Sequence, residues 1–326
     1  MINRKKIFPK IIFILKLLIT LSLCIVILKN VEWENFLKAL HNSNLVLILV
    51  VFCCMIANIL LSSLKWKILL SIHGIQFEFS KLSKYYFSAF FFNNFLPTNI
   101  GGDGYRIFKT IKNPHSKAGA VTAILMERIT GILALLFIGF VAGLYSFLQD
   151  GDKISRLSTI IGLAGIFAIV FFSIIIVWRG NLSWILNRKF LPQKIKKVIE
   201  HIGDYQQHAF KTFQVAFISI IFHVFFVFFR FLLIIAVGAE ISIFHLALAV
   251  VISTLVALIP ITINGIGLLD GSFIYLLVNY GVSNEQAVIV MLLIRALQIP
   301  LSLIGGMFYF LDRQSYQIKN IQAEKI

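Results

Sequence analysis

The sequence predicts an all-α polytopic integral membrane protein, and three observations carry that prediction. The 326 residues are 59% hydrophobic and include 32 phenylalanines, and the mean hydropathy of +0.91 exceeds what a soluble core requires. Several apolar runs reach the ~20 helical residues that cross a hydrocarbon core of ~30 Å. Two further apolar stretches are interrupted by proline, asparagine and glycine. We therefore expect about six full transmembrane helices plus two re-entrant or broken helical hairpins.

The six expected crossings are apolar stretches separated by polar or charged segments. They cover residues 11–28, 44–64, 118–147, 157–178, 213–236 and 286–311. Arg4, Lys5 and Lys6 precede the first crossing, as in a signal peptide, but no small-x-small cleavage site follows. We interpret this crossing as a retained anchor, so that residues 1–326 form a single membrane domain.

The formal net charge of +16 is distributed very unevenly along the chain. The segments 1–10, 65–84, 103–117, 179–211 and 312–326 hold 22 lysines and arginines, whereas 29–43, 148–156, 237–243 and 281–286 hold 4. An excess of basic residues marks cytoplasmic loops, so both termini and the basic loop 179–211 are expected in the cytoplasm, beneath the inner membrane. The charge thus reports orientation, and no nucleic-acid partner is expected.

The first broken stretch, 85–106, ends in the sequence FLPTNIGGDGYR. Lys84 and Arg106 flank it on the same basic side, which predicts a hairpin that enters and leaves the membrane by one face. Its expected tip, 97–104, has little helix propensity and leaves backbone groups unpaired. Lipid cannot satisfy those groups, so the tip must face protein or a wet cavity.

The second broken stretch, 244–280, contains PITINGIGLLDG and lies between Glu240 and Glu285, on the sparsely basic side. It predicts a hairpin from the opposite face, with residues 260–271 at its tip. Each hairpin has one crossing before it and one after it. Residues 44–147 and 213–311 therefore resemble inverted-topology repeats, whose discontinuous helices build a substrate site near the midplane.

An equal spacing supports this repeat. Asp103 and Arg128 are 25 residues apart, and so are Asp270 and Arg295. Glu127, Arg128, Arg230, Asp270 and Arg295 are expected within the hydrophobic zone, where each charge at a lipid-facing midplane position would cost ~2.5–3.5 kcal/mol, so we expect these side chains to face inward. Two interpretations stay open: salt bridges that hold the hairpins in place, or an excess of arginine that binds an anionic headgroup.

His223 and Arg230 are seven residues apart, so they share one face of their predicted helix. His223 either packs in the core or carries protons near neutral pH. Helix N-termini that follow Gly102 and Gly267 would add positive dipole ends toward the same anion.

The strings FLPTNIGGDGYRIF, ILMERITGILALL, PITINGIGLLDGSFIYLL and LLIRALQIP resemble the flippase-like membrane domain of lysylphosphatidylglycerol synthases, over roughly residues 10–312. That resemblance implies movement of an aminoacylated or glycosylated lipid across the bilayer, and it implies functional roles for Asp103, Arg106, Glu127 and Arg128. Asp270 departs from the glutamate usual in the second motif. We expect no lysyl transfer, because the chain ends fifteen residues after the last predicted crossing.

The leading hypothesis is a flippase or transporter of an anionic, aminoacylated or glycosylated lipid. The candidate substrate-binding residues are Asn99, Gly101, Gly102, Asp103, Arg106, Glu127, Arg128, His223, Arg230, Asn264, Gly265, Gly267, Asp270 and Arg295. The alternatives are a membrane-embedded lipid transferase with Asp103 and Glu127 as general bases, or an accessory subunit with a structural polar core. Without a Walker A, HExxH or Cys/His ligand motif, we expect no cofactor or metal. A lipid synthase or glycosyltransferase encoded nearby is the expected partner.

Overall fold

The computed structural model describes residues 4–29, 31–95, 101–111, 116–150, 156–157, 159–160, 162–165, 167, 201, 203–205, 207–259 and 261–323. All regular structure in these ranges is helical and none is strand, which confirms the predicted all-α class. Most of the predicted crossing 157–178 and of the basic loop 179–211 lies outside the described residues. Asn99 and Pro260 also lie outside the described residues.

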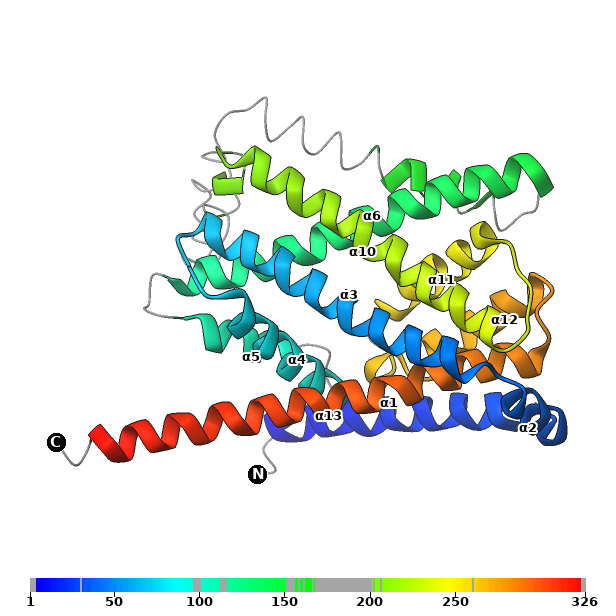
Figure 1. Cartoon of the computed structure of the whole chain (residues 1–326), viewed down its shortest axis with the longest axis horizontal. Coiled ribbons are helices and arrows are strands. Elements are labelled where there is room, and N and C mark those ends of the chain that lie inside the picture. Colours follow the sequence, from blue (N-terminus) through cyan, green and yellow to red (C-terminus); the bar gives the residue numbers. More distant parts are fainter. Residues whose placement is uncertain are drawn as a thin grey trace.

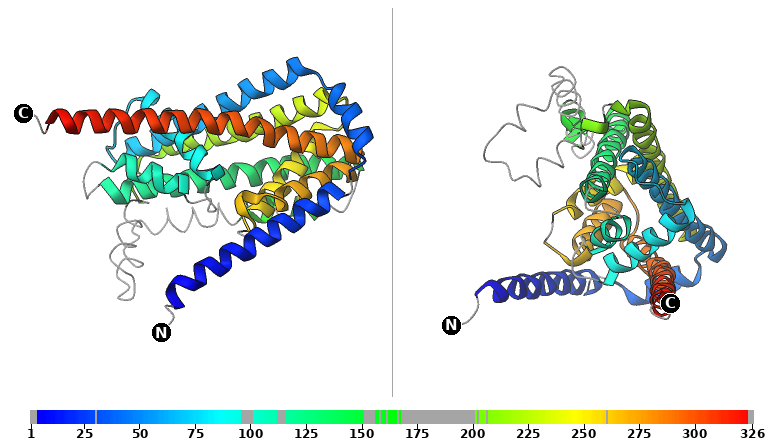
Figure 2. Two further views of the ribbon diagram at one scale, coloured as in Figure 1. Left: turned by 90° about the horizontal axis from the view of Figure 1, so that it is seen from below. Right: turned by 90° about the vertical axis from the view of Figure 1, so that its left-hand side faces the viewer.

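The helices follow one another through a bundle of long, roughly aligned helices (Figure 1). They are α1 (Arg4–Lys29), α2 (Trp33–His41), α3 (Leu45–Ile72), α4 (Phe79–Phe95), α5 (Gly101–Thr110), α6 (Ser116–Asp150), α10 (Ala209–Ala236), α11 (Ile243–Ala257), η1 (Ile263–Gly265), α12 (Leu268–Asn279) and α13 (Asn284–Ala323). α1 packs against α12 and η1, and its N-terminal part diverges from the bundle (Figure 2).

Four described helices are long and apolar enough to cross a membrane. They span Leu45–Ile72, Ser116–Gln149, Ala209–Ala236 and Asn284–Asp312, and they match four of the six predicted crossings. A shorter apolar stretch, Leu15–Ile27, lies within α1. The helix of the predicted crossing 44–64 extends beyond that range, because α3 continues to Ile72, and Lys65 is buried inside the protein instead of lying in a loop.

The two broken stretches form helix pairs at opposite ends of the bundle: α4 with α5, and α11 with α12 (Figure 1). Both predicted non-helical tips, 97–104 and 260–271, extend too far along the chain. Gly101–Gly104 already belong to α5, and α12 begins at Leu268. A first helical turn tolerates such residues because its N–H groups lack intrahelical acceptors in any case. Entry of either pair from one membrane face, and the inverted repeat itself, stay predictions.

Two glycines allow α4 to pack very closely against its neighbours. A Cβ added at Gly102 of α5 would lie 2.3 Å from the carbonyl oxygen of Ala89, and one added at Gly305 of α13 would lie 2.0 Å from that of Phe87. The amide of Gly102 also donates to Asn93 Oδ1 at 2.9 Å. These contacts fix α4 between α5 and α13, beside the cavity described next.

Candidate functional site

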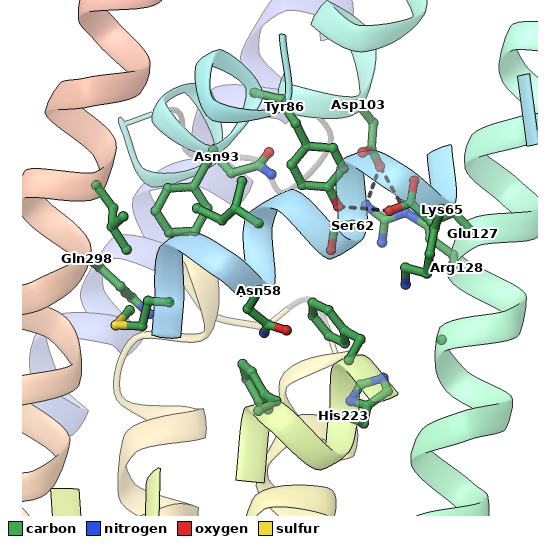
Figure 3. Close-up of a pocket in the computed structure, with 18 of the residues that line it drawn as sticks. Asn58, Ser62, Lys65, Tyr86, Asn93, Asp103, Glu127, Arg128, His223 and Gln298 are labelled. Carbon is green, nitrogen blue, oxygen red and sulfur yellow. Dashed lines mark hydrogen bonds and ion pairs between the residues drawn. The ribbon is translucent and has the colours of Figure 1, made fainter. Parts of the chain in front are cut away.

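A cavity of about 340 Å³ lies between α3, α4, α5, α6, α10 and α13. Its volume falls within the range of about 300–1,000 Å³ that is usual for small-molecule sites. Polar side chains from all six helices line it, several of which are visible in Figure 3. They are Asn58, Ser62, Lys65, Tyr86, Asn93, Asp103, Arg106, Glu127, Arg128, His223, Arg230 and Gln298.

Arg106 is the most completely engaged charge in the cavity wall. Its guanidinium lies 4.3 Å from the ring centres of both Trp66 and Tyr86, and it donates to Glu127 Oε2. The second oxygen of Glu127 accepts a hydrogen bond of 2.8 Å from Tyr86. Arg106 and Glu127 are both buried. This cluster therefore joins α5 to α6, α4 and α3, while the buried Nε of Arg106 has no hydrogen-bond partner among the described residues.

Arg128 forms the second ion pair of this wall. Its Nε donates to Asp103 Oδ2 at 2.9 Å, and its Nη2 reaches the same oxygen. Asp103 Oδ1 lies 3.5 Å from Arg106 Nη1, so this carboxylate is shared between two arginines. The side chain of Arg128 is 49% exposed, which places it at the rim of the cavity. The contact fits the first interpretation of the intramembrane charges, a salt bridge that holds the first hairpin in place.

Two buried cations in the cavity wall have no such partner. Lys65 and Arg230 are 3% and 6% exposed, and neither forms an ion pair with a carboxylate that the structure describes. Lys65 Nζ lies 4.7 Å from the ring centre of Phe222, and the Arg230 guanidinium lies 3.6 Å from that of Phe226. Arg230 Nη1 also donates to the carbonyl of Phe226.

The charged residues of this wall comprise four cations and only two carboxylates, so the described lining carries an excess of positive charge. Aromatic faces attract cations but bring no negative charge to neutralise them. An excess of positive charge in such surroundings is costly, and an entering anion would lower that cost.

His223 lies with Arg230 on the cavity side of α10, as their spacing predicts. It is buried, and its Nδ1 has no hydrogen-bond partner among the described residues. On α3, Asn58 Oδ1 also lacks one within that part of the chain. Figure 3 shows Asn58 and His223 away from the ion pairs of Asp103 and Glu127. The cavity thus offers unused polar groups as well as unpaired cations.

The second broken motif is built differently. Asn264, Gly265 and Gly267 all have positive φ, which glycine adopts freely and asparagine tolerates. Asp270 Oδ2 accepts from the amide of Gly267 at 2.9 Å and so caps α12, while its Oδ1 accepts from Arg295 Nη2 at 2.7 Å. The N-terminus of α12, whose positive dipole end was expected to attract a substrate anion, is therefore already capped by the carboxylate of Asp270.

Side chains of the second motif contact the first region without lining the cavity. Asn264 Nδ2 donates to Asn94 Oδ1 at 2.8 Å, which joins the loop before α12 to the end of α4. Arg295 Nη1 lies 3.4 Å from Oε1 of Gln298, and Gln298 lines the cavity.

The structure gathers only part of the predicted site. The predicted residues that line the cavity are Asp103, Arg106, Glu127, Arg128, His223 and Arg230. Outside its lining lie Gly101, Gly102, Asn264, Gly265, Gly267, Asp270 and Arg295, and Asn99 falls outside the described residues.

Sequence reasoning missed Lys65, because it assigned this residue to a cytoplasmic loop. A signal was present: Asn58, Ser62 and Lys65 follow one another at spacings of four and three, the pattern of one helical face. That face lines the cavity.

The family model described as the lysylphosphatidylglycerol synthase TM region matches residues 13–306, which include the whole cavity wall and both broken motifs. The chain belongs to this family. Membership makes it a membrane protein associated with lipid modification or transport. No curated protein matches the sequence.

Proposed function

We propose that this member of the lysylphosphatidylglycerol synthase membrane family moves an anionic lipid across the cytoplasmic membrane. The headgroup enters the cavity while the acyl or prenyl tails stay in the bilayer. The supporting observation is the pair of buried, unpaired cations, Lys65 and Arg230, in a cavity of about 340 Å³. A phosphate supplies the missing negative charge, and a guanidinium can bind it through two parallel hydrogen bonds.

This proposal assigns different roles to the arginines than the sequence suggested. Arg106 and Arg295 are held by carboxylates, so they position helices. Lys65 and Arg230 hold the headgroup, and Arg128 at the rim meets it on entry. An aminoacyl or glycosyl group on the lipid would find hydrogen-bonding partners in Asn58 and His223, which have unused polar atoms.

The contact between Asn94 and Asn264 suggests how access could alternate. In an inverted repeat, one broken pair closes each side of a central site. The helix pairs α4–α5 and α11–α12 meet at this hydrogen bond. Separating the two helix pairs on one side of the membrane at a time would expose the cavity to one leaflet and then to the other. We place both termini in the cytoplasm in this scheme, as the charge asymmetry predicts.

The alternative of a lipid transferase receives less support from the cavity. A general base needs an available carboxylate, whereas Asp103 and Glu127 both accept hydrogen bonds from arginines, and Tyr86 occupies the other oxygen of Glu127.

The test is reconstitution of purified protein into liposomes that carry a fluorescent phosphatidylglycerol in both leaflets. A membrane-impermeant quencher then measures how fast inner-leaflet lipid becomes accessible. Lys65→Gln and Arg230→Gln are compared with Lys67→Gln, which removes an exposed charge two residues away on α3. A charge-assisted contact contributes about 1.5–3 kcal/mol, so each cavity variant should slow movement about tenfold or more.

Lys67→Gln should move the lipid at the wild-type rate. The proposal fails if folded wild-type protein moves neither this lipid nor a polyprenyl phosphate, or if the cavity variants match Lys67→Gln.

A further inference from the structure

A second cluster of chemically active side chains lies outside the cavity, where α3 ends and the chain approaches α10. His73 follows the last residue of α3, and His201 and Asp204 precede the start of α10. One ligand atom from each of the three lies within 4.8 Å of the others. This cluster could not be predicted from local sequence patterns, because 128 residues separate His73 from His201.

The hydrogen bonds of His73 orient its ring toward this cluster. Its Nε2 lies 2.9 Å from the hydroxyl of Tyr205, whereas its buried Nδ1 has no hydrogen-bond partner in the described part of the chain. That Nδ1 lies 3.3 Å from Asp204 Oδ2, and the His73 side chain is only 2% exposed. If Nε2 carries the proton and donates it to Tyr205, a lone pair on Nδ1 faces a carboxylate oxygen.

In that arrangement the lone pair on His73 Nδ1 and the Asp204 oxygen repel each other unless a positive charge lies between them. His201 points a further nitrogen at the same place: its Nδ1 lies 2.9 Å from Asp204 Oδ2. Two imidazole nitrogens and one carboxylate oxygen therefore converge around one point.

We propose that His73, His201 and Asp204 bind a divalent transition-metal ion, with Zn²⁺ as the best match. Zinc accepts nitrogen and oxygen ligands at about 2.0–2.2 Å, which places tetrahedral ligand atoms about 3.3–3.6 Å apart. The 3.3 Å from His73 Nδ1 to Asp204 Oδ2 already fits, and the partly exposed His201, whose Nδ1 lies 2.9 Å from the same oxygen, has to move to complete the geometry. Tyr205 holds the outer nitrogen of His73, as outer partners of metal-bound histidines do.

The metal would connect the end of α3 to the segment that leads into α10. These two helices pack against each other along the cavity and carry Lys65 and Arg230. A cross-link at their common end would stabilise the helix pair without touching the cavity. The inference is independent of lipid transport, since binding can be measured without any lipid.

The chain provides a matched control in His208. It lies close to the cluster, but its Nδ1 is already hydrogen-bonded to the backbone carbonyl of Asp204 at 3.0 Å. His208→Ala removes a neighbouring imidazole without removing a proposed ligand. His201 and Asp204 are partly exposed, so His201→Ala and Asp204→Asn should fold even if a His73 variant does not.

The experiment uses the full chain in detergent, purified through a tag without histidine and stripped with a chelator. Co²⁺ is titrated while its visible absorption is recorded, and Zn²⁺ is then added in competition. We expect one site per chain, with affinity at least about tenfold lower in His201→Ala and Asp204→Asn and unchanged in His208→Ala. Tyr205→Phe should weaken binding about 10–100-fold through loss of the outer hydrogen bond.

A second readout is the thermal unfolding midpoint with and without Zn²⁺. Binding to the folded state alone should raise it in the wild type and in His208→Ala, and leave it unchanged in His201→Ala. The inference is overturned if the wild type binds either metal no more tightly than His201→Ala does. It is equally overturned if His208→Ala loses as much affinity as Asp204→Asn.

Discussion

The α4–α5 and α11–α12 regions each supply the aspartate of an Asp–Arg pair, whose arginine lies in the next helix, and the two pairs have different surroundings. Asp103 pairs with Arg128, and Asp270 pairs with Arg295, each across 25 residues. The first pair lies in a cavity wall with further cations, whereas the second caps a helix and remains outside that wall. A repeated motif therefore fixes a recurring contact, but the neighbouring helices decide whether a ligand site forms around it.

The neighbouring helices differ in a specific way. Beside the first pair, α3 contributes Lys65 and α10 contributes His223 and Arg230, and all three are buried in the cavity wall. Beside the second pair, the additional polar contact of Arg295 is the neutral Gln298. We infer that the first region handles substrate and that the second positions helices.

The largest expected effect is on stability, from Glu127→Gln. The substitution leaves the buried Arg106 with only the more distant Asp103 to neutralise it, and loss of one partner of a buried pair costs about 3–5 kcal/mol. Chemical unfolding in detergent should show this loss. Arg106→Met combined with Glu127→Gln should recover much of it, and a double variant as unstable as the single one would contradict the pairing.

Asp270→Asn should cost less, because Arg295 is more exposed and has Gln298 as a second contact. Removing a hydrogen-bonded charge costs about 1.5–3 kcal/mol. The same unfolding measurement checks this value, and lipid movement should continue in the folded variant. A transport defect larger than that of Lys65→Gln would overturn the assignment of the second region to a positioning role.

A smaller effect is expected from Gly102→Ala, where the new Cβ would lie 2.3 Å from the backbone of α4. Forcing extra volume into a packed contact costs about 1–3 kcal/mol. The matched control is Gly104→Ala in the same helix, whose Cβ meets nothing within 4 Å. It should be neutral or stabilise by up to about 1 kcal/mol. Equal effects of the two substitutions would exclude close packing as the reason for Gly102.

The sequence predicted the helical membrane class, four long crossings and the two breaks, because hydropathy and helix-breaking residues are local signals. It also gave salt bridges as one of two open interpretations of the charges, with Asp103 or Glu127 as the partner of Arg128 and Asp270 as that of Arg295; the structure has the Asp103–Arg128 and Asp270–Arg295 contacts. It assigned Lys65 to a loop, because a charge next to an apolar run resembles the end of a crossing. Burial of Lys65 depends on α10, which supplies Phe222 from more than 150 residues away.

The central claim is that the unpaired cations of the first region hold an anionic headgroup. Native mass spectrometry can count lipids retained by the detergent-released protein after incubation with equal amounts of phosphatidylglycerol and phosphatidylcholine. We predict that the wild type and Asp270→Asn retain phosphatidylglycerol preferentially, and that Lys65→Gln combined with Arg230→Gln loses this preference. A folded double variant that retains phosphatidylglycerol as well as the wild type does would contradict the claim.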